Sequence, residues 1–116
     1  MEVNQSLKSW KLPSNQLTQH SPVTLRGLLT HSAGVTVPGF GGYESGSLLP
    51  TPIQILNGEP PANIPPIRVD MTPGKMWRYS GGGFQIVQQM MTDVTGTPFD
   101  ILMQQWLLRP LGMQHS

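Results

Sequence analysis

The chain has 116 residues and a formal net charge of +1, with seven Lys and Arg against six Asp and Glu. This length is typical of one domain, and so balanced a charge gives no sign of a nucleic-acid or anionic-membrane partner. The sequence has no cysteine, which excludes disulfides, thiolate metal sites and cysteine nucleophiles. No apolar run reaches the roughly 18 residues of a membrane-spanning helix, and the first residues do not resemble a signal peptide, so localisation stays open.

The first twenty residues predict one short helix and a loop. Val3, Leu7 and Trp10 lie at helical spacing, so we expect a helix over residues 2–9. Residues 14–20 are polar and predict a loop.

A clearer helix is predicted after Thr24, whose side chain can cap its N-terminus. Leu25, Leu28 and Leu29 would share its buried face, and Gly34 would be its stop.

The middle of the chain predicts long loops around one short helix. Residues 35–50 are rich in glycine and predict a loop. Thr51, followed by Pro52, is typical of a helix start, and Gly58 of its end. Five prolines in residues 59–73 predict extended coil.

The last third predicts two longer helices. Ser80 can cap the first helix, which Gly96 would end, and its buried face would carry Phe84, Val87, Met91 and Val94, widened by Ile86 and Met90. The glutamines, with Thr92 and Asp93, would form the opposite, polar face. Thr97 would cap the second helix, which would end near Pro110 and bury Phe99, Leu102, Met103 and Trp106.

Neither a metal site nor a phosphate-binding loop is predicted, and we expect no cofactor. His20, His31 and His115 are isolated, without a second ligand at metal-binding spacing. For His31 we expect a hydrogen bond to the local backbone at a helix end. The glycine clusters match neither G-x-G-x-x-G nor a P-loop.

The most informative stretch surrounds Tyr79, which immediately precedes the helix cap Ser80. Three glycines follow at residues 81–83, where alanine would favour a helix by about 1 kcal/mol each. They suggest close approach of another backbone or of a ligand. A helix N-terminus and a nearby cation, Arg78 or Lys75, would favour a phenolate that acts as a base. The alternative is a tyrosine whose ring packs under the helix.

Four segments in order resemble the serine β-lactamase-like hydrolases, which include class C β-lactamases, D-alanyl-D-alanine carboxypeptidases, D-aminopeptidases and esterases. Residues 24–34 (TLRGLLTHSAG) are similar to the family's T-L-R-x-L-L-T-H-x-[SA]-G helix. The others are Pro73-Gly74 with Tyr79-Ser80, then Val94-Thr95-Gly96, then Arg109 to Met113.

The resemblance implies a role for Tyr79. The family's chemistry uses a Ser and a Lys in S-x-x-K, a Tyr in Y-x-N, and a K-T-G-like strand that completes the oxyanion hole. Tyr79 corresponds to the tyrosine, which moves a proton from the serine to the leaving group. Gly81 stands where the asparagine would be, which argues against an efficient β-lactamase and favours an esterase, a peptidase or another amide hydrolase.

The remaining catalytic elements are absent from these 116 residues. No serine has a lysine three residues later, and no lysine begins a K-T-G. We therefore expect residues 1–116 to be a single partial domain. It would be the mostly α, helical subdomain of the α+β β-lactamase/transpeptidase-like fold, with long Gly/Pro-rich loops and little or no sheet, and inactive alone.

Alternatives remain for the function and for several residues. Phe40 and Tyr43 would rim a substrate cleft beside Gly81, or form a self-packed surface loop. Trp77 would be a stacking wall for substrate, or a core or interface residue. The chain would contact the remaining parts of a hydrolase, a small ester or amide substrate, or a second copy of itself. The alternative from another class is a non-catalytic binding or assembly module.

Overall fold

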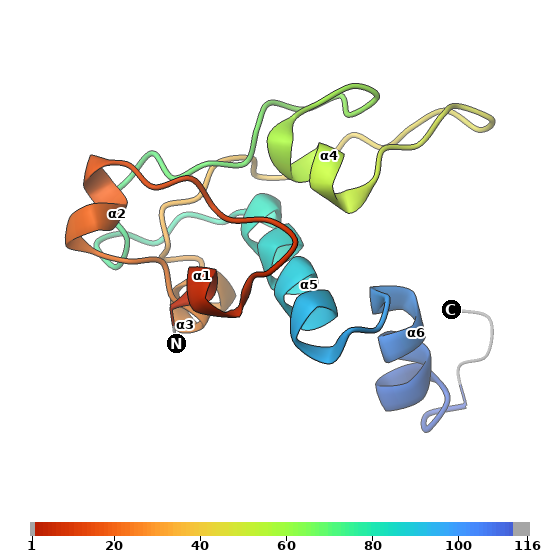
Figure 1. Ribbon diagram of the computed structural model, residues 1–116. Coiled ribbons are helices and arrows are strands. Elements are labelled where there is room, and N and C mark those ends of the chain that lie inside the picture. Colours follow the sequence, from red (N-terminus) through yellow and green to blue (C-terminus); the bar gives the residue numbers. More distant parts are fainter. Residues whose placement is uncertain (1, 113–116) are drawn as a thin grey trace.

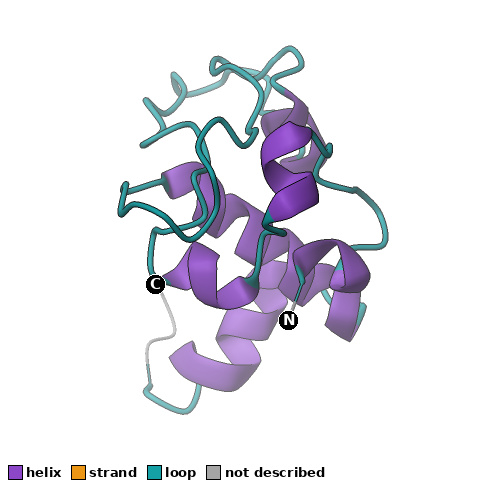
Figure 2. Cartoon of the chain, turned by 90° about the vertical axis from the view of Figure 1, so that its left-hand side faces the viewer, coloured by secondary structure: helices purple, strands orange, loops and turns teal. Residues whose placement is uncertain are grey.

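The computed structural model describes residues 2–112. Helices are the only named elements in this range (Figure 1): α1 Val3–Ser6, α2 Gln16–His20, α3 Leu25–Leu29, α4 Pro52–Asn57, α5 Gly81–Thr95, α6 Phe99–Met103 and the π-helix η1 Gln104–Leu108. Two isolated bridges, Glu2 with Thr24 and Val35 with Val69, are the only β pairing there. The prediction of a mostly helical chain with long loops and no sheet is therefore confirmed (Figure 2). None of the helices within residues 2–112 is long and apolar enough to cross a membrane.

Helix α5 is the centre of the fold, and α1, α3, α4 and α6 pack against it (Figure 1). Both of its predicted ends are confirmed. Ser80 Oγ accepts a hydrogen bond of 3.0 Å from the Gly83 N–H, and Gly96 takes the left-handed conformation at φ 69°. The side chains that are fully buried around α5 come from every third of the chain: Leu7, Leu28, Leu56, Ile67 and Ile86.

The predicted buried face of α5 is wrong by part of a turn. Ile86 and Met90 are buried as expected, but Phe84 is 44% exposed and Val94 is 61% exposed. Gln89, assigned to the polar face, is buried instead. The reason is that the N-terminal segment packs against the side of α5 that carries Gln89.

A carboxylate fastens that segment to α5. Asp93 accepts hydrogen bonds from the Lys8 and Ser9 backbone N–H groups, at 2.7 and 3.1 Å, and from the Ser9 hydroxyl at 2.6 Å. Gln89 Nε2 donates to the same carboxylate at 3.1 Å and to Ser9 Oγ at 2.8 Å. Burial raises the pKa of Asp93, but these hydrogen bonds outweigh it, so the net pKa lies below its ordinary value.

The loop predicted over residues 14–20 is wrong, because α2 forms there. Asn15 accepts hydrogen bonds from the Leu17 and Thr18 N–H groups, while Thr18 Oγ1 accepts one from the Asn15 N–H. This reciprocal capping box supports a helix of a single turn. Leu17 also packs against the core, which adds apolar burial to the cap.

The helix after Thr24 is confirmed, but its end and its face differ from the prediction. Thr24 Oγ1 accepts the Gly27 N–H at 3.0 Å, as expected of a cap. The helix ends at Leu29, which is 48% exposed, whereas Leu28 is buried. Gly34 is not the stop: a Cβ there would lie 2.3 Å from the Met71 carbonyl oxygen, so glycine serves a close backbone approach.

The last predicted helix reaches Leu108, near its predicted end, because α6 continues directly into η1, but it is more exposed than expected. Thr97 does not cap it, since Pro98 is the N-cap residue and no side chain caps the helix. Leu102 is buried, but Trp106 in η1 is 58% exposed. The main contact of α6 with the preceding helices is with α5, and several apolar side chains at this end of the chain stay exposed: Ile101, Trp106, Leu107 and Leu111.

Candidate active site

Tyr79 lies at the N-terminal end of α5 with its ring in solvent. Its side chain is 55% exposed, so the alternative of a ring packed under the helix is wrong. The next residue, Ser80, is buried and donates its hydroxyl to the Thr36 carbonyl oxygen at 2.8 Å. Ser80 therefore holds the backbone beside Tyr79 while the phenol faces outward.

The glycines after Ser80 allow the chain at residues 36–38 to approach the first turn of α5. The Gly81 N–H donates to the Pro38 carbonyl and the Gly82 N–H to the Val37 carbonyl, each at 3.0 Å. A Cβ on Gly82 would lie 2.7 Å from the Thr36 carbonyl oxygen. The prediction that the glycines permit close approach of another backbone is confirmed.

The Tyr79 ring lies against the imidazole of His31, with ring centroids 4.5 Å apart and planes 33° apart. Trp77 and Phe84 also contact this imidazole, at centroid distances of 6.0 and 5.2 Å. Three aromatic residues from the α5 region thus gather around one histidine that follows α3. Trp77 is 69% exposed, so it is not a core residue, and its role at a substrate wall or an interface stays a prediction.

The His31 N–H bonds to the local backbone, at the Leu28 carbonyl (3.3 Å), but its imidazole and its carbonyl bond to a distant segment, which was not predicted. Its Nδ1 accepts the Ser80 N–H at 3.1 Å, and its carbonyl oxygen accepts the Arg78 N–H at 2.7 Å. In the sequence, the pattern T-H-S-A-G at residues 30–34 is what singles out His31, and the spacing of the residues does not link His31 to Tyr79.

The cation expected beside the phenol is engaged elsewhere. Arg78 Nη2 donates to the Val35 carbonyl at 2.9 Å and forms an ion pair with Asp70. Lys75 is exposed, and no contact joins its side chain to Tyr79 among the described residues. A cation beside the phenol is therefore not found within residues 2–112.

An apolar groove of about 440 Å³ follows the exposed side of α5; Tyr79 is not among the residues that line it, but Gly81, two residues later, is. Phe40 and Gly81 line it together, since the Phe40 ring lies 3.4 Å from the Cβ position of Gly81. Its other lining residues come from α5 and α6: Phe84, Gln85, Val87, Gln88, Met91, Phe99 and Met103. Part of the stripe predicted as core therefore lines an open groove.

Tyr43 is not among the residues that line this groove. Its hydroxyl accepts the Asn63 N–H at 3.2 Å, and Asn63 Nδ2 donates to the Gly42 carbonyl at 2.9 Å. The tip of the glycine-rich loop is thus fastened to the proline-rich coil. Of the predicted substrate-binding residues, the structure brings Phe40 and Gly81 together and leaves Tyr43 apart from them.

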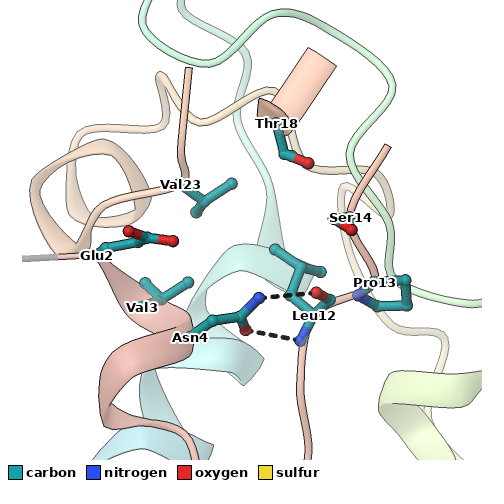
Figure 3. A pocket seen from close by; sticks show the side chains of 8 residues that line it. All are labelled: Glu2, Val3, Asn4, Leu12, Pro13, Ser14, Thr18 and Val23. Carbon is teal, nitrogen blue, oxygen red and sulfur yellow. Dashed lines mark hydrogen bonds between the residues drawn. The ribbon is translucent and has the colours of Figure 1, made fainter. Parts of the chain in front are cut away.

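The described residues offer no metal site in addition to these contacts. No group of three or more His, Asp or Glu that could hold a metal ion occurs within residues 2–112, and His115 lies outside this range. A small cavity of about 60 Å³ lies between α1 and the segment that leads into α2, where Asn4 pairs with both backbone groups of Leu12 (Figure 3). None of the predicted site residues lines it.

The amino-acid sequence of the chain matches a known protein family. The family described as Beta-lactamase matches residues 9–116, and the chain therefore belongs to the beta-lactamase family. The protein of Bacillus subtilis (strain 168) described as "Putative penicillin-binding protein PbpX" is 24% identical over 94 residues. This match covers 81% of the present chain and 21% of the relative, so the chain spans about a fifth of the length of the curated relative it matches.

Proposed function

We propose that the chain is the tyrosine-bearing helical part of a serine hydrolase that acts on amide or ester bonds through an acyl-enzyme. The observation that carries this proposal is the exposed phenol of Tyr79 directly before α5, the helix that lines an apolar groove, in a chain of the beta-lactamase family. A phenol that is held by its backbone and open to solvent can meet a hydroxyl from another segment.

Tyr79 would take part in two successive proton transfers, first from the serine and then to the leaving group. As phenolate it accepts the proton of a serine hydroxyl while the serine oxygen bonds to the substrate carbonyl carbon. The phenol then donates that proton to the leaving group as the scissile bond breaks, which leaves the acyl group on serine.

The groove along α5 supports a substrate with an apolar portion. Phe40 and Phe84, which line it, are each 44% exposed, and Gly81 lines it as well. A side chain at position 81 would meet the Pro38 carbonyl at 3.0 Å, so this site offers no room for a side-chain amide unless residues 38–40 shift. We therefore favour an ester or a simple amide over a substrate whose acylamino group needs that contact.

The isolated chain is proposed to be inactive, because neither S-x-x-K nor K-T-G occurs in its 116 residues. A tyrosine without a nucleophile and oxyanion donors supplies no acyl-enzyme chemistry. With a chromogenic ester or a chromogenic cephalosporin, the chain alone should give no burst of product. A burst would contradict the missing-nucleophile argument.

The decisive test joins residues 1–116 to family segments that carry S-x-x-K upstream and K-T-G downstream. In this complemented hydrolase Tyr79→Phe should lower kcat for a p-nitrophenyl ester by about 10²–10⁴-fold, the usual contribution of a general acid–base group. Tyr43→Phe is the matched control and should leave kcat within about twofold. Circular dichroism shows that each variant has folded. Equal turnover by the folded Tyr79→Phe variant and the wild type would refute the proposal.

The alternative is a non-catalytic binding or assembly module. The exposed apolar side chains of Val94 and Trp106 favour it, because a monomer rarely leaves such surface open. They would contact either other parts of a hydrolase or a second copy of the chain. Under this alternative, Tyr79→Phe leaves the affinity for the partner unchanged.

A further inference from the structure

We propose that His31 is the positioning residue that sets the orientation of the Tyr79 phenol, an inference that rests on the proposed role of Tyr79. Nothing in the sequence pattern joins these two residues, which lie 48 positions apart. Their relation comes from three contacts that converge on one histidine.

The backbone of His31 adopts a conformation that side chains rarely take. Its φ is 58°, in the left-handed region, directly after the C-cap residue Thr30 of α3. A non-glycine residue there is held by its surroundings rather than by its own preference. This turn points both the carbonyl and the imidazole of His31 at residues 78–80.

Two hydrogen bonds to His31 bracket Tyr79 in the chain. The Arg78 N–H donates to the His31 carbonyl at 2.7 Å, and the Ser80 N–H donates to His31 Nδ1 at 3.1 Å. The residue before Tyr79 and the residue after it are thus fixed to the same partner. Because a backbone N–H can only donate, Nδ1 must be an unprotonated acceptor, and the neutral imidazole carries its proton on Nε2.

The imidazole face fixes the ring as well as the backbone. It lies 4.5 Å from the Tyr79 ring at 33°, and Phe84, one turn into α5, packs against the same imidazole at 5.2 Å. No hydrogen bond engages the Tyr79 hydroxyl among residues 2–112, and Tyr79 is 55% exposed. Contact with His31 is therefore the interaction that can hold this ring in one rotamer while its oxygen stays free.

The first test reads the contact in the 116-residue chain without any activity. The chain has two tyrosines, so 3-fluorotyrosine gives two ¹⁹F resonances, and Tyr43→Phe assigns them. His31→Ala should move and broaden the Tyr79 resonance, whereas His20→Ala, on the exposed end of α2, should not. In ¹⁵N spectra, Nδ1 of His31 should have the shift of an acceptor nitrogen at neutral pH. An unmoved Tyr79 resonance, or a protonated Nδ1 in the neutral ring, would overturn the proposal.

The second test separates positioning from folding in the complemented hydrolase. His31→Ala should lower kcat by an amount on the order of 10²-fold, with KM within about twofold, because a displaced acid–base group weakens the transition state more than substrate binding. His31→Asn tolerates the left-handed backbone and keeps an acceptor near Nδ1, so it should recover about tenfold of that loss. If His31→Ala keeps the wild-type kcat while Tyr79→Phe does not, positioning is refuted and the proposed function survives. If Tyr79→Phe also keeps it, the proposed function fails, and the ¹⁹F result still reports the contact.

Discussion

A pair of neighbouring glycines in the first turn of α5 offers a sharp test of how the site is built. Gly82→Ala and Gly83→Ala add the same methyl group to the same helix, so the alanine preference, up to about 1 kcal/mol, is shared and cancels in their comparison. A Cβ on Gly83 would lie 3.5 Å from Leu28 Cδ2, which is ordinary contact. A Cβ on Gly82 would lie 2.7 Å from the Thr36 carbonyl oxygen, which belongs to the backbone and cannot turn aside.

The magnitude follows from what the overlap displaces. Overpacking of this kind costs about 1–3 kcal/mol, and a shift of the 36–38 segment also weakens the Gly82 N–H bond to the Val37 carbonyl, worth about 0.5–1.5 kcal/mol. Gly82→Ala should therefore unfold with a free energy about 1.5–4.5 kcal/mol below that of Gly83→Ala. Urea titrations followed by circular dichroism measure this difference, provided that the two m-values agree. Equal stabilities, or a more stable Gly82→Ala, would refute the docking of residues 36–38 on α5.

Three further predictions concern the rest of the fold. The pKa of Asp93 is lowered in the folded state, so its carboxylate stabilises the native state at pH values above the ordinary aspartate pKa near 3.9, and this stabilisation is lost as the pH falls through the folded pKa. Asp93→Asn should therefore have a lower free energy of unfolding at pH 7 and a weaker dependence of that free energy on pH in the acid range. Equal pH dependence in the variant and the wild type would contradict this. Leu56→Ala should lower the unfolding free energy by about 2–5 kcal/mol, since Leu56 is fully buried, whereas Leu48→Ala, 79% exposed, should change it by less than about 0.5 kcal/mol. Trp106→Glu should weaken self-association, measured by sedimentation velocity. An unchanged distribution of sedimentation coefficients would show that η1 is not part of the surface through which copies associate.

Helix ends in this chain could be predicted because their chemistry is local. Ser80 and Gly96 bound α5, and Thr51 and Gly58 bound α4, as the sequence indicates. A cap needs only a side chain or a left-handed residue at the right offset from the helix. The same local chemistry operates at α2, where Asn15 is the N-cap residue.

Helix faces could not be predicted as well, because burial depends on which partner covers the helix. Gln89 is buried since its amide meets Ser9 and Asp93, while Val94, on the predicted apolar stripe, is exposed. Periodicity gives the polarity of each side of a helix but not the position of a neighbouring segment eighty residues away. Part of the α5 stripe lines an open groove for this reason.

The candidate site was predictable in part. Tyr79 could be selected from its position before a helix cap and from the resemblance around it, and its exposure agrees with that choice. His31 was assigned a local backbone bond, because no rule of spacing links it to Ser80. The pairing of these residues is a tertiary contact between the end of α3 and the start of α5, two elements that pack together.

The hydrogen bonds already made by the first N–H groups of α5 limit where an oxyanion could bind. The N–H groups of Gly81 and Gly82 donate to carbonyls of the 36–38 segment, and that of Gly83 donates to Ser80 Oγ. A helix start with its first donors already paired has little to offer a developing negative charge, although such termini often bind anions. If Tyr79 works as proposed, the donors for the tetrahedral intermediate must come from a segment other than this helix turn. A proton-transfer group at the start of α5 and oxyanion donors on a separate element would then divide the chemistry between two parts of the hydrolase, and this division is the physical reason for proposing that the chain is inactive by itself.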